Sequence, residues 1–354
     1  MKPEPDSTLR PHPRPDKPVR LKDIALELGL STVTISKVLR NHPDISDATR
    51  QRVLRRMEEL NYLPNFAARA LVTGHTWTIG LVVPDLLHPF FAQIAKAISA
   101  GIRQHGYSLI LASSEEDPKL EQREIEQLLA RRVDVLLVAS AQASPAGFRT
   151  IAERGVPLIL IDRCFAGFGA NFVGVDDETV GLVATRHLID QGCTRIAHIR
   201  GPETSTAVGR LNGYRKALAE KGRKPLPGHV VSIGASGDDR GEPGGYAATR
   251  KLLALKQRPD GIFCFNDPVA LGAMRAIFEA GLRIPNDVAV VGCGNVLHLD
   301  LLRVPLTSVD QESSAIGSHA AELALSLVKG NGAVQPRTML FTPRLVARAS
   351  TLRA

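Results

Sequence analysis

From Thr76 onward, apolar runs of strand length alternate with segments of helical periodicity. The runs are TIGLVV, YSLILAS, DVLLVA, VPLILI, RIAHIR, GIFCF and DVAVVGC. They are continuously apolar, as expected for strands buried on both faces of a sheet. Because such strands alternate with helices, this region predicts parallel sheets covered by helices. It is long enough for two sheets.

The N-terminal part has a different pattern. Residues 1–19 are rich in proline and charge, which predicts a disordered tail. Three short amphipathic helices are then expected between Arg20 and Tyr62, with Gly29 in a tight turn and with Ser31 and Ser46 as N-caps. This spacing is typical of a helix-turn-helix. The expected apolar core is Ile24, Ala25, Leu28, Ile35, Val38, Leu39, Val53, Met57 and Leu60.

Charge points to an anionic partner. The formal net charge is +8, and residues 1–75 contain 13 Lys+Arg against 9 Asp+Glu. The second helix has a polar, mostly uncharged outer face, which suits contact with base edges. The arginines of the third helix either contact phosphates or form an ordinary solvated face. They are Arg50, Arg52, Arg55 and Arg56.

Other compartments and chemistries are not indicated. No apolar stretch approaches the roughly 18 residues of a membrane span, and the N-terminus lacks the apolar core of a signal peptide, so we expect a cytoplasmic protein without membrane contact. The cysteines have no metal-ligand spacing, and we expect four buried, reduced thiols and no cofactor. They are Cys164, Cys193, Cys264 and Cys293.

The segment from Leu21 to Leu71 closely resembles the headpiece of the lactose/galactose-repressor (LacI) family. The resemblance implies that the second helix enters the major groove, where Thr32, Val33 and Lys37 read bases, flanked by Ser31 and Ser36. It also implies a hinge that becomes helical on DNA. The hinge carries Asn65, Arg69 and Leu71, and Leu71 is the wedge in the minor groove or, alternatively, an ordinary interdomain packing residue.

The rest of the chain resembles the type I periplasmic-binding-protein fold that this family uses as its regulatory domain. The resemblance rests on IGLVVPDLLHPFF, PLILIDR, GPETSTAVGRLNGY, FNDPVALGAMRAI and IPNDVAVVGCGN. It implies two lobes with chain crossovers and a ligand between them at the carboxyl ends of strands. The expected domains are a tail (1–19), a helix-turn-helix domain (20–63), a hinge and linker (64–75), and an effector-binding and dimerisation domain (76–354).

Nine positions match the effector-binding positions of the family. Phe90 and Phe91 either pack over the ligand or fill the core, and Asp267 either binds ligand or, as we favour, caps the following helix. The positions are Phe90, Phe91, Ser140, Asp162, Arg210, Arg240, Asn266, Asp267 and Gly294.

Gly294 departs from the family pattern, because relatives often carry a carboxylate there that grips sugar hydroxyls. Asn295 follows it in this sequence. Since Arg210 and Arg240 are expected at the same cleft, we expect an anionic effector such as a sugar acid or a phosphosugar.

The predicted function is a sequence-specific regulator, a repressor more readily than an activator. It would bind a near-palindromic operator as a homodimer, with an affinity set by a small molecule. One alternative is a regulator whose C-terminal domain only dimerises or binds a partner protein. An NAD-type enzyme is a remote alternative, because no catalytic motif is present and Leu297 interrupts the dinucleotide pattern in GCGNVL.

Overall fold

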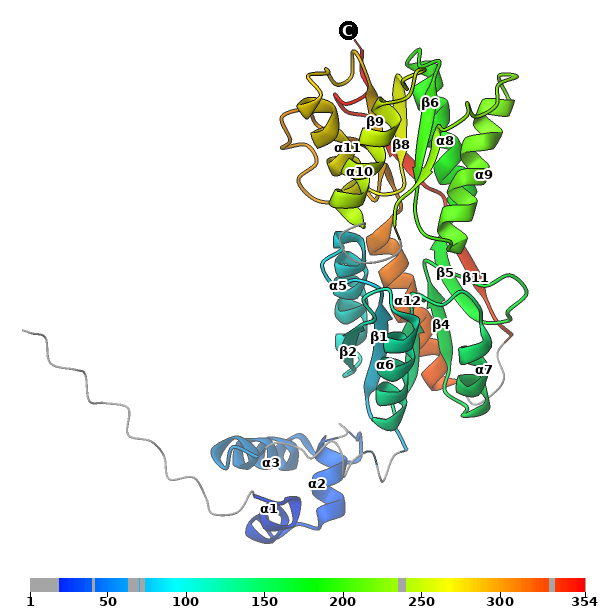
Figure 1. The fold of residues 1–354 in the computed structure, drawn as a ribbon. Helices are drawn as coiled ribbons and strands as arrows, with labels where there is room; N and C mark the ends of the chain where they lie inside the picture. The colour runs from blue at the N-terminus through cyan, green and yellow to red at the C-terminus, as the bar shows by residue number, and fades with distance from the viewer. Residues whose placement is uncertain are drawn as a thin grey trace, which may run out of the picture. The chain divides into compact units, whose positions relative to one another are not determined.

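The computed structural model describes residues 19–39, 42–62, 70, 74–234, 240–330 and 335–353, which belong to two units, Met1–Gly74 and His75–Ala354. Figure 1 shows the elements of both units. Within the described residues, no helix is both long and apolar enough to cross a membrane.

The first unit contains three helices, α1 (Leu21–Leu28), α2 (Thr32–Leu39) and α3 (Asp47–Glu59). Gly29 ends α1 with a φ of 64°, a conformation that glycine adopts without strain. Both expected caps are confirmed. Ser31 Oγ accepts a hydrogen bond from Thr34 N at 3.0 Å, and Ser46 Oγ accepts one from Thr49 N at 3.3 Å. The buried core is Ile24, Ala25, Ile35, Val38, Val53 and Met57, with Leu28, Leu39 and Leu60 packed against it.

The first lobe of the second unit is built on a six-stranded sheet with the order β11-β5-β4-β3-β1-β2, in which every pair is parallel. Helices α5 and α12 cover one face, and α6 and α7 cover the other. The strands are β1 (Thr78–Val83), β2 (Ser108–Ser113), β3 (Val135–Val138), β4 (Leu158–Ile161), β5 (Asn171–Val175) and β11 (Thr338–Phe341). The helices are α5 (Pro89–Arg103), α6 (Pro118–Ala130), α7 (Ala146–Glu153) and α12 (Ser313–Lys329).

The second lobe repeats this plan with the strand order β12-β10-β9-β8-β6-β7. It departs from the all-parallel expectation at one edge, where β12 runs antiparallel to β10. Helices α8 and α9 cover one face, and α10 and α11 the other. The strands are β6 (Ile196–Arg200), β7 (Val230–Ser232), β8 (Gly261–Cys264), β9 (Ala289–Cys293), β10 (Thr307–Asp310) and β12 (Arg344–Val346). The helices are α8 (Asp177–Asp190), α9 (Ser205–Ala219), α10 (Gly241–Leu253) and α11 (Asp267–Glu279).

The chain passes between the lobes three times, from β5 to α8, from β10 to α12, and from β11 to β12. Contacts join these crossings to one another. Asp176 N donates to Phe341 O at 3.1 Å, and Arg344 forms an ion pair with Glu312. The two lobes are therefore linked along one side by three neighbouring segments.

Glycines allow two helix pairs of the second lobe to touch through their backbones. A Cβ atom at Gly181 of α8 would lie 2.0 Å from Arg210 O of α9, and one at Gly272 of α11 would lie 1.9 Å from Glu242 O of α10. Any larger residue at either position would force the helices apart.

The cysteine prediction is correct for Cys193, Cys264 and Cys293, which are buried free thiols. It is wrong for Cys164, which is exposed. Strand β4 ends at Ile161, so Cys164 lies in the following loop and does not share the burial of the strand.

Candidate functional site

The outward face of α2 is free of core packing. Ser31, Thr32 and Val33 are exposed, and Val33 retains 60% of its surface, while Ile35 and Val38 of the same helix are buried. Ser36 and Lys37 are half-buried. The helix thus supports the headpiece with one face and presents the predicted base-reading residues on the other.

Lys37 has an acidic partner that the sequence reasoning missed. Its Nζ lies 2.5 Å from Asp44 Oδ2, and Asp44 also contacts His42 Nδ1. The hydrogen bond from Lys37 lowers the pKa of Asp44 below its usual range. A carboxylate therefore lies beside the lysine that is predicted to contact a base.

The arginines of α3 also make contacts within the headpiece that had not been expected, although Arg52 remains exposed as the solvated alternative expects. Arg50 donates to His42 O at 2.9 Å, and Arg52 donates to Leu28 O. Arg56 pairs with Glu27 at 2.7 Å and with Glu59 at 2.8 Å. Arg55 is exposed, as expected. The hinge positions Asn65, Arg69 and Leu71 lie outside the described residues.

In the first lobe, polar groups meet at the carboxyl ends of β3 and β4. Ser140 Oγ donates to Glu121 Oε1 at 2.8 Å, and burial raises the pKa of Glu121. Arg163 donates to both carboxylate oxygens of Glu116, at 2.7 and 2.6 Å. Asp162 is also buried and adopts a φ of 63°. Ser140 and Asp162 are therefore in the same region, together with Glu116, Glu121 and Arg163, which had not been predicted.

Phe90 and Phe91 lie in the core of the first lobe, with exposures of 3% and 5%. This position fits the core-filling alternative. His88, the N-cap of α5, instead reaches the other lobe, where its Nε2 lies 3.1 Å from Asn266 Nδ2. Burial lowers the pKa of His88 to about 4, so the ring is neutral at physiological pH.

Arg210 is 3% exposed and already has partners. Its Nε donates to Asp177 Oδ1 at 2.9 Å, one Nη donates to Phe265 O at 2.6 Å, and the guanidinium lies 4.7 Å from the centre of the Phe265 ring. Burial raises the pKa of Asp177 to about 7 despite this arginine. Because a carboxylate already balances much of the charge of Arg210, the physical basis for an anionic effector is weaker than the sequence suggested.

Asn266, and not Asp267, caps α11, so the favoured capping role of Asp267 is wrong. Asn266 Oδ1 accepts from Val269 N at 3.0 Å. Asp267 is fully buried, where it accepts from Ser308 Oγ at 2.6 Å and from Val296 N at 3.0 Å. Burial raises the pKa of Asp267 to about 6.

The carboxylate of Asp267 also borders the position where the family pattern is broken. A Cβ at Gly294 would lie 3.1 Å from Asp267 Oδ2, and Gly294 has a φ of 129°. Asn295 does not replace the missing acid, because its side chain binds Asp310 at 3.0 Å and Arg348 at 2.8 Å. The remaining predicted residue, Arg240, donates to Glu115 O of the other lobe at 2.9 Å.

Two family models match the chain. The model of bacterial regulatory proteins of the lacI family matches residues 20–65, and the model of periplasmic binding proteins and the sugar-binding domain of the LacI family matches residues 76–349. These matches confirm the expected fold, with a helix-turn-helix headpiece and a two-lobed α/β domain.

Relatives extend over nearly the whole chain. It is 35% identical to the HTH-type transcriptional regulator GalR of Escherichia coli (strain K12) over 93% of this chain and 95% of that protein. It is 33% identical to the ribose operon repressor of the same organism over 93% of this chain and 99% of that protein.

Solved structures agree. A lac repressor dimer bound to operator and the anti-inducer ONPF is 28% identical, with a TM-score of 0.83 over 95% of this chain and 100% of that chain. A complex of the transcriptional regulator CelR with cellobiose is 30% identical, with a TM-score of 0.71 over 94% and 99% of the two chains. With a headpiece and a regulatory domain that both match, the chain belongs to the LacI family of bacterial regulatory proteins.

Proposed function

We propose that this protein is a homodimeric repressor that binds a near-palindromic operator. Its affinity for the operator rises or falls when a small molecule binds in the interlobe cleft. The observation that carries the proposal is the outward face of α2, where Val33 remains 60% exposed on a helix whose opposite face builds the headpiece core. A regulator of this kind acts in the cytoplasm, where the DNA is, and needs no catalytic activity.

DNA reading is assigned to α2. The methyl groups of Thr32 and Val33 suit contact with a thymine methyl, and the amino group of Lys37 suits guanine acceptors. Ser31 and Ser36 flank these residues. The hinge, within residues 64–75, supplies Asn65, Arg69 and Leu71 to the minor groove, where insertion of Leu71 bends the duplex. Two headpieces per dimer would read two half-sites.

Effector binding is assigned to the cleft of the second unit. Three of its proposed residues already take part in contacts between the lobes or beside them: Asn266 with His88, Arg240 with Glu115, and Arg210 with Asp177. A ligand that replaces these contacts would change the relative preference for two lobe arrangements. A coupling of about 1–3 kcal/mol would change operator occupancy roughly 5- to 150-fold.

Selection of duplexes from a random library by the full-length protein tests the DNA-binding half of the proposal. We expect enrichment of a near-palindromic sequence bound by two chains. Gel shifts on the selected and a scrambled duplex then measure the specificity ratio. Failure to enrich any sequence would contradict sequence-specific binding, and an enriched site bound by a single chain would contradict the dimer.

The wedge and the effector need separate tests. Leu71→Ala should retain operator binding but lose most of the bend in a circular-permutation gel shift, because alanine cannot hold a base step open. A panel of neutral sugars, sugar acids and phosphosugars, added to the gel shift, identifies the effector class. No response to any class would favour the alternative that the second unit only dimerises or binds a partner protein.

A further inference from the structure

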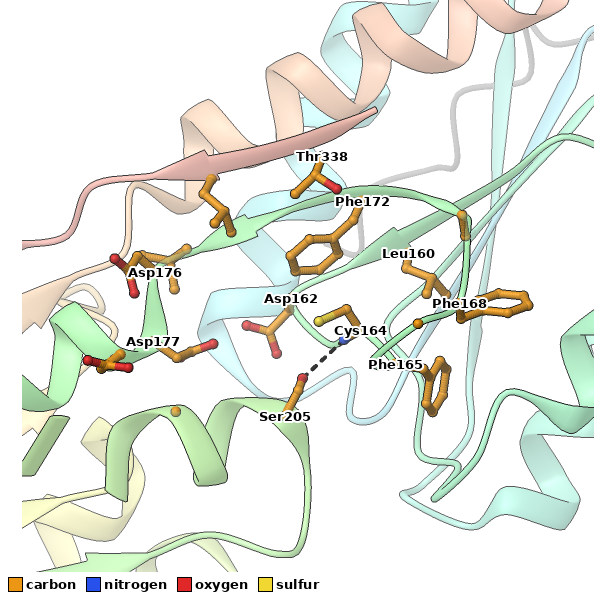
Figure 2. A pocket seen from close by; sticks show the side chains of 16 residues that line it. Leu160, Asp162, Cys164, Phe165, Phe168, Phe172, Asp176, Asp177, Ser205 and Thr338 are labelled. Carbon is orange, nitrogen blue, oxygen red and sulfur yellow. Dashed lines mark hydrogen bonds between the residues drawn. The ribbon is translucent and has the colours of Figure 1, made fainter. Parts of the chain in front are cut away.

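A hollow of about 430 Å³ lies where the two lobes meet, at the edge of the first sheet (Figure 2). It is bordered by the loop after β4, by β11, and by the first turns of α8 and α9. Its volume is within the range of small-molecule sites. Of the nine proposed effector residues, Asp162 lines it, whereas Arg210, Arg240 and Asn266 do not. The hollow therefore lies beside the proposed effector contacts and shares Asp162 with them, so its occupant rests in part on the proposed function.

The walls of the hollow combine aromatic rings with carboxylates. Phe165 and Phe168, whose ring centres are 6.3 Å apart, form one side of it. No lysine, arginine or histidine is found among the described residues that line it. The apolar wall consists of Leu160, Phe165, Phe168, Phe172 and Leu340, and the acidic wall consists of Asp162, Asp176, Asp177 and Glu178.

Three of the four acids have partners within hydrogen-bond distance. Asp176 caps α8 by accepting from Thr179 N at 3.1 Å and from its hydroxyl at 2.6 Å. Asp177 is paired with Arg210, and Glu178 lies 2.7 Å from Lys216 Nζ. Asp162 has a more distant partner, because Arg163 Nε lies 3.8 Å from its Oδ2, and its Oδ1 has no hydrogen-bond partner within the described residues.

Asp162 is 6% exposed, and its Oδ1 has no hydrogen-bond partner within the part of the chain that the structure describes. Its other oxygen lies 3.8 Å from Arg163 Nε, beyond hydrogen-bond distance. Figure 2 shows the carboxylate directed toward Asp177 and Ser205. A buried carboxylate in this condition is unfavourable unless a proton or a cation joins it, and burial indeed raises the pKa of both Asp162 and Asp177.

We propose that this hollow binds a protonated organic amine, with the ammonium group between Asp162 and Asp177 and the apolar part against Phe165 and Phe168. The ammonium has three donors for the carboxylates and the Ser205 hydroxyl, and the phenylalanine rings provide an apolar surface for the rest of the molecule. A metal ion fits less well, because no group of three or more His, Cys, Asp or Glu side chains converges on a common point among the described residues.

Several positive charges near the hollow would favour an anion over an ammonium group, but their sum is smaller than the negative charge of the four acids. The N-termini of α8 and α9 point toward the hollow and each favour an anion by about half a unit charge. Arg210 and Lys216 add positive charge from behind the wall. When all four acids are ionised, their charge exceeds that of the two cations and the two helix N-termini by about one unit, and the two capped N-termini already donate to Asp176 and Thr204. An anion would have to approach the unpartnered oxygen of Asp162 directly.

Calorimetric titration of the full-length protein at pH 8 tests the proposal with three probes of matched shape: phenethylamine, phenethyl alcohol and phenylacetate. We expect phenethylamine to bind at least about tenfold more tightly than the alcohol, because charge-assisted hydrogen bonds to a buried carboxylate are added. Phenylacetate should bind more weakly than either. Equal binding of amine and alcohol, a preference for the anion, or no binding of the amine would each overturn the proposal.

Two substitutions refine the test. Asp162→Asn should weaken amine binding about tenfold, whereas Asp190→Asn, which removes the same charge at an exposed position at the end of α8, should leave it unchanged. Phe168→Ala should weaken amine and alcohol alike. If Asp162→Asn fails to fold, as judged by circular dichroism, the comparison of the three probes on the unaltered protein still decides.

The pH dependence gives an independent measurement. The titratable and charged groups around the ammonium position are Asp162, Asp176, Asp177, Glu178, Glu116, Arg163, Arg210, Lys216 and Cys164. Because the pKa of Asp177 is about 7, protons compete with the amine as the pH falls, and affinity should decrease between pH 8 and pH 6. An increase would contradict the proposed position. None of these titrations requires DNA, so a failure here is distinguishable from a failure of operator binding.

Discussion

The headpiece and the two-lobed unit place the side chains proposed to bind DNA and effector in opposite environments. In the headpiece, Val33 is 60% exposed and Lys37 contacts the exposed Asp44, while a separate set of apolar residues forms the core. In the two-lobed unit, Arg210 is 3% exposed and Asp267 is fully buried, and both are tied into hydrogen-bond networks. The proposed recognition residues therefore lie outside the core in the first unit and form part of the buried structure in the second.

The largest effect that would sharpen this comparison is expected for Arg210→Ala. Removing the guanidinium leaves Asp177 buried without its ion-pair partner and removes a favourable charge near Asp162, which should lower the free energy of unfolding by about 3–5 kcal/mol at pH 8. Urea denaturation measures this, with the exposed Arg215→Ala as the matched control. A loss below about 1 kcal/mol for Arg210→Ala would show that the cleft is as separable from folding as the headpiece face.

The corresponding change in the headpiece is Lys37→Ala. We expect a loss of about 1–3 kcal/mol in operator binding with little change in the free energy of unfolding, since the amino group is proposed to contact a base and its contact within the headpiece is the exposed ion pair with Asp44. Gel-shift titrations on operator and scrambled duplexes measure the effect. Equal losses on both duplexes would instead identify Lys37 as a phosphate contact.

Asp267 makes the stability of the second unit depend on pH. Its pKa in the folded protein is about 6, raised by burial from an ordinary 3.8, so the folded state binds this proton more tightly than the unfolded state does. The resulting stability is present in full below about pH 4 and is lost as the pH rises through 6.

Asp267→Asn should remove this dependence, because the amide can still accept from Val296 N and can donate to Ser308 Oγ. Between pH 5 and pH 8, the variant should lose less stability than the unaltered protein, by about 1–2 kcal/mol. Urea denaturation at both pH values measures the difference. Identical losses in the two proteins would show that Asp267 does not titrate in this range.

The smallest effect is expected for Asp44→Asn. Loss of this exposed carboxylate removes a repulsion from phosphates and releases Lys37, so binding to scrambled DNA should strengthen by less than about 1 kcal/mol and its salt dependence should steepen by about one charge. Titrations at several salt concentrations measure both. An unchanged salt slope would mean that the pair with Lys37 does not control phosphate contact.

Local patterns in the sequence predicted most of the fold. The continuous apolar runs became strands, as TIGLVV did for β1, and both serine caps of the headpiece lie where expected. These features depend on neighbouring residues. Strand order, and the antiparallel edge made by β12, depend on pairings between distant segments and could not be read from any one segment.

The site was predicted less completely for the same reason. Asn266 and Asp267 are equally good caps in a sequence, and the choice depends on Ser308, which is 41 residues away and holds the carboxylate of Asp267. Likewise, the sequence alone suggests that Arg210 is an unpaired cation, because its partner Asp177 is 33 residues away in the chain and comes close only in the folded protein. The long-range partners of charged groups decide their role, and they become visible only in three dimensions.

The three crossings between the lobes also determine how this chain can be synthesised and folded. Helix α12 and strand β11, which complete the first lobe, and strand β12 together with the buried Ser350, which complete the second, all come from the last part of the chain. Ser350 Oγ, for example, donates to Val290 O at 2.7 Å.

During synthesis from the N-terminus, neither lobe can therefore be finished before the final residues emerge. Until then, the side chains of α5 that pack against α12, such as Ile94 and Ile98, remain uncovered, and exposed apolar surface of this kind promotes aggregation. Premature termination within α12 or β11 removes a part of both lobes at once, because β12 and Ser350 of the second lobe follow these elements, so such a product does not contain one complete lobe. The truncated chain would contain two incomplete cores, and we expect chaperones and proteases to act on it.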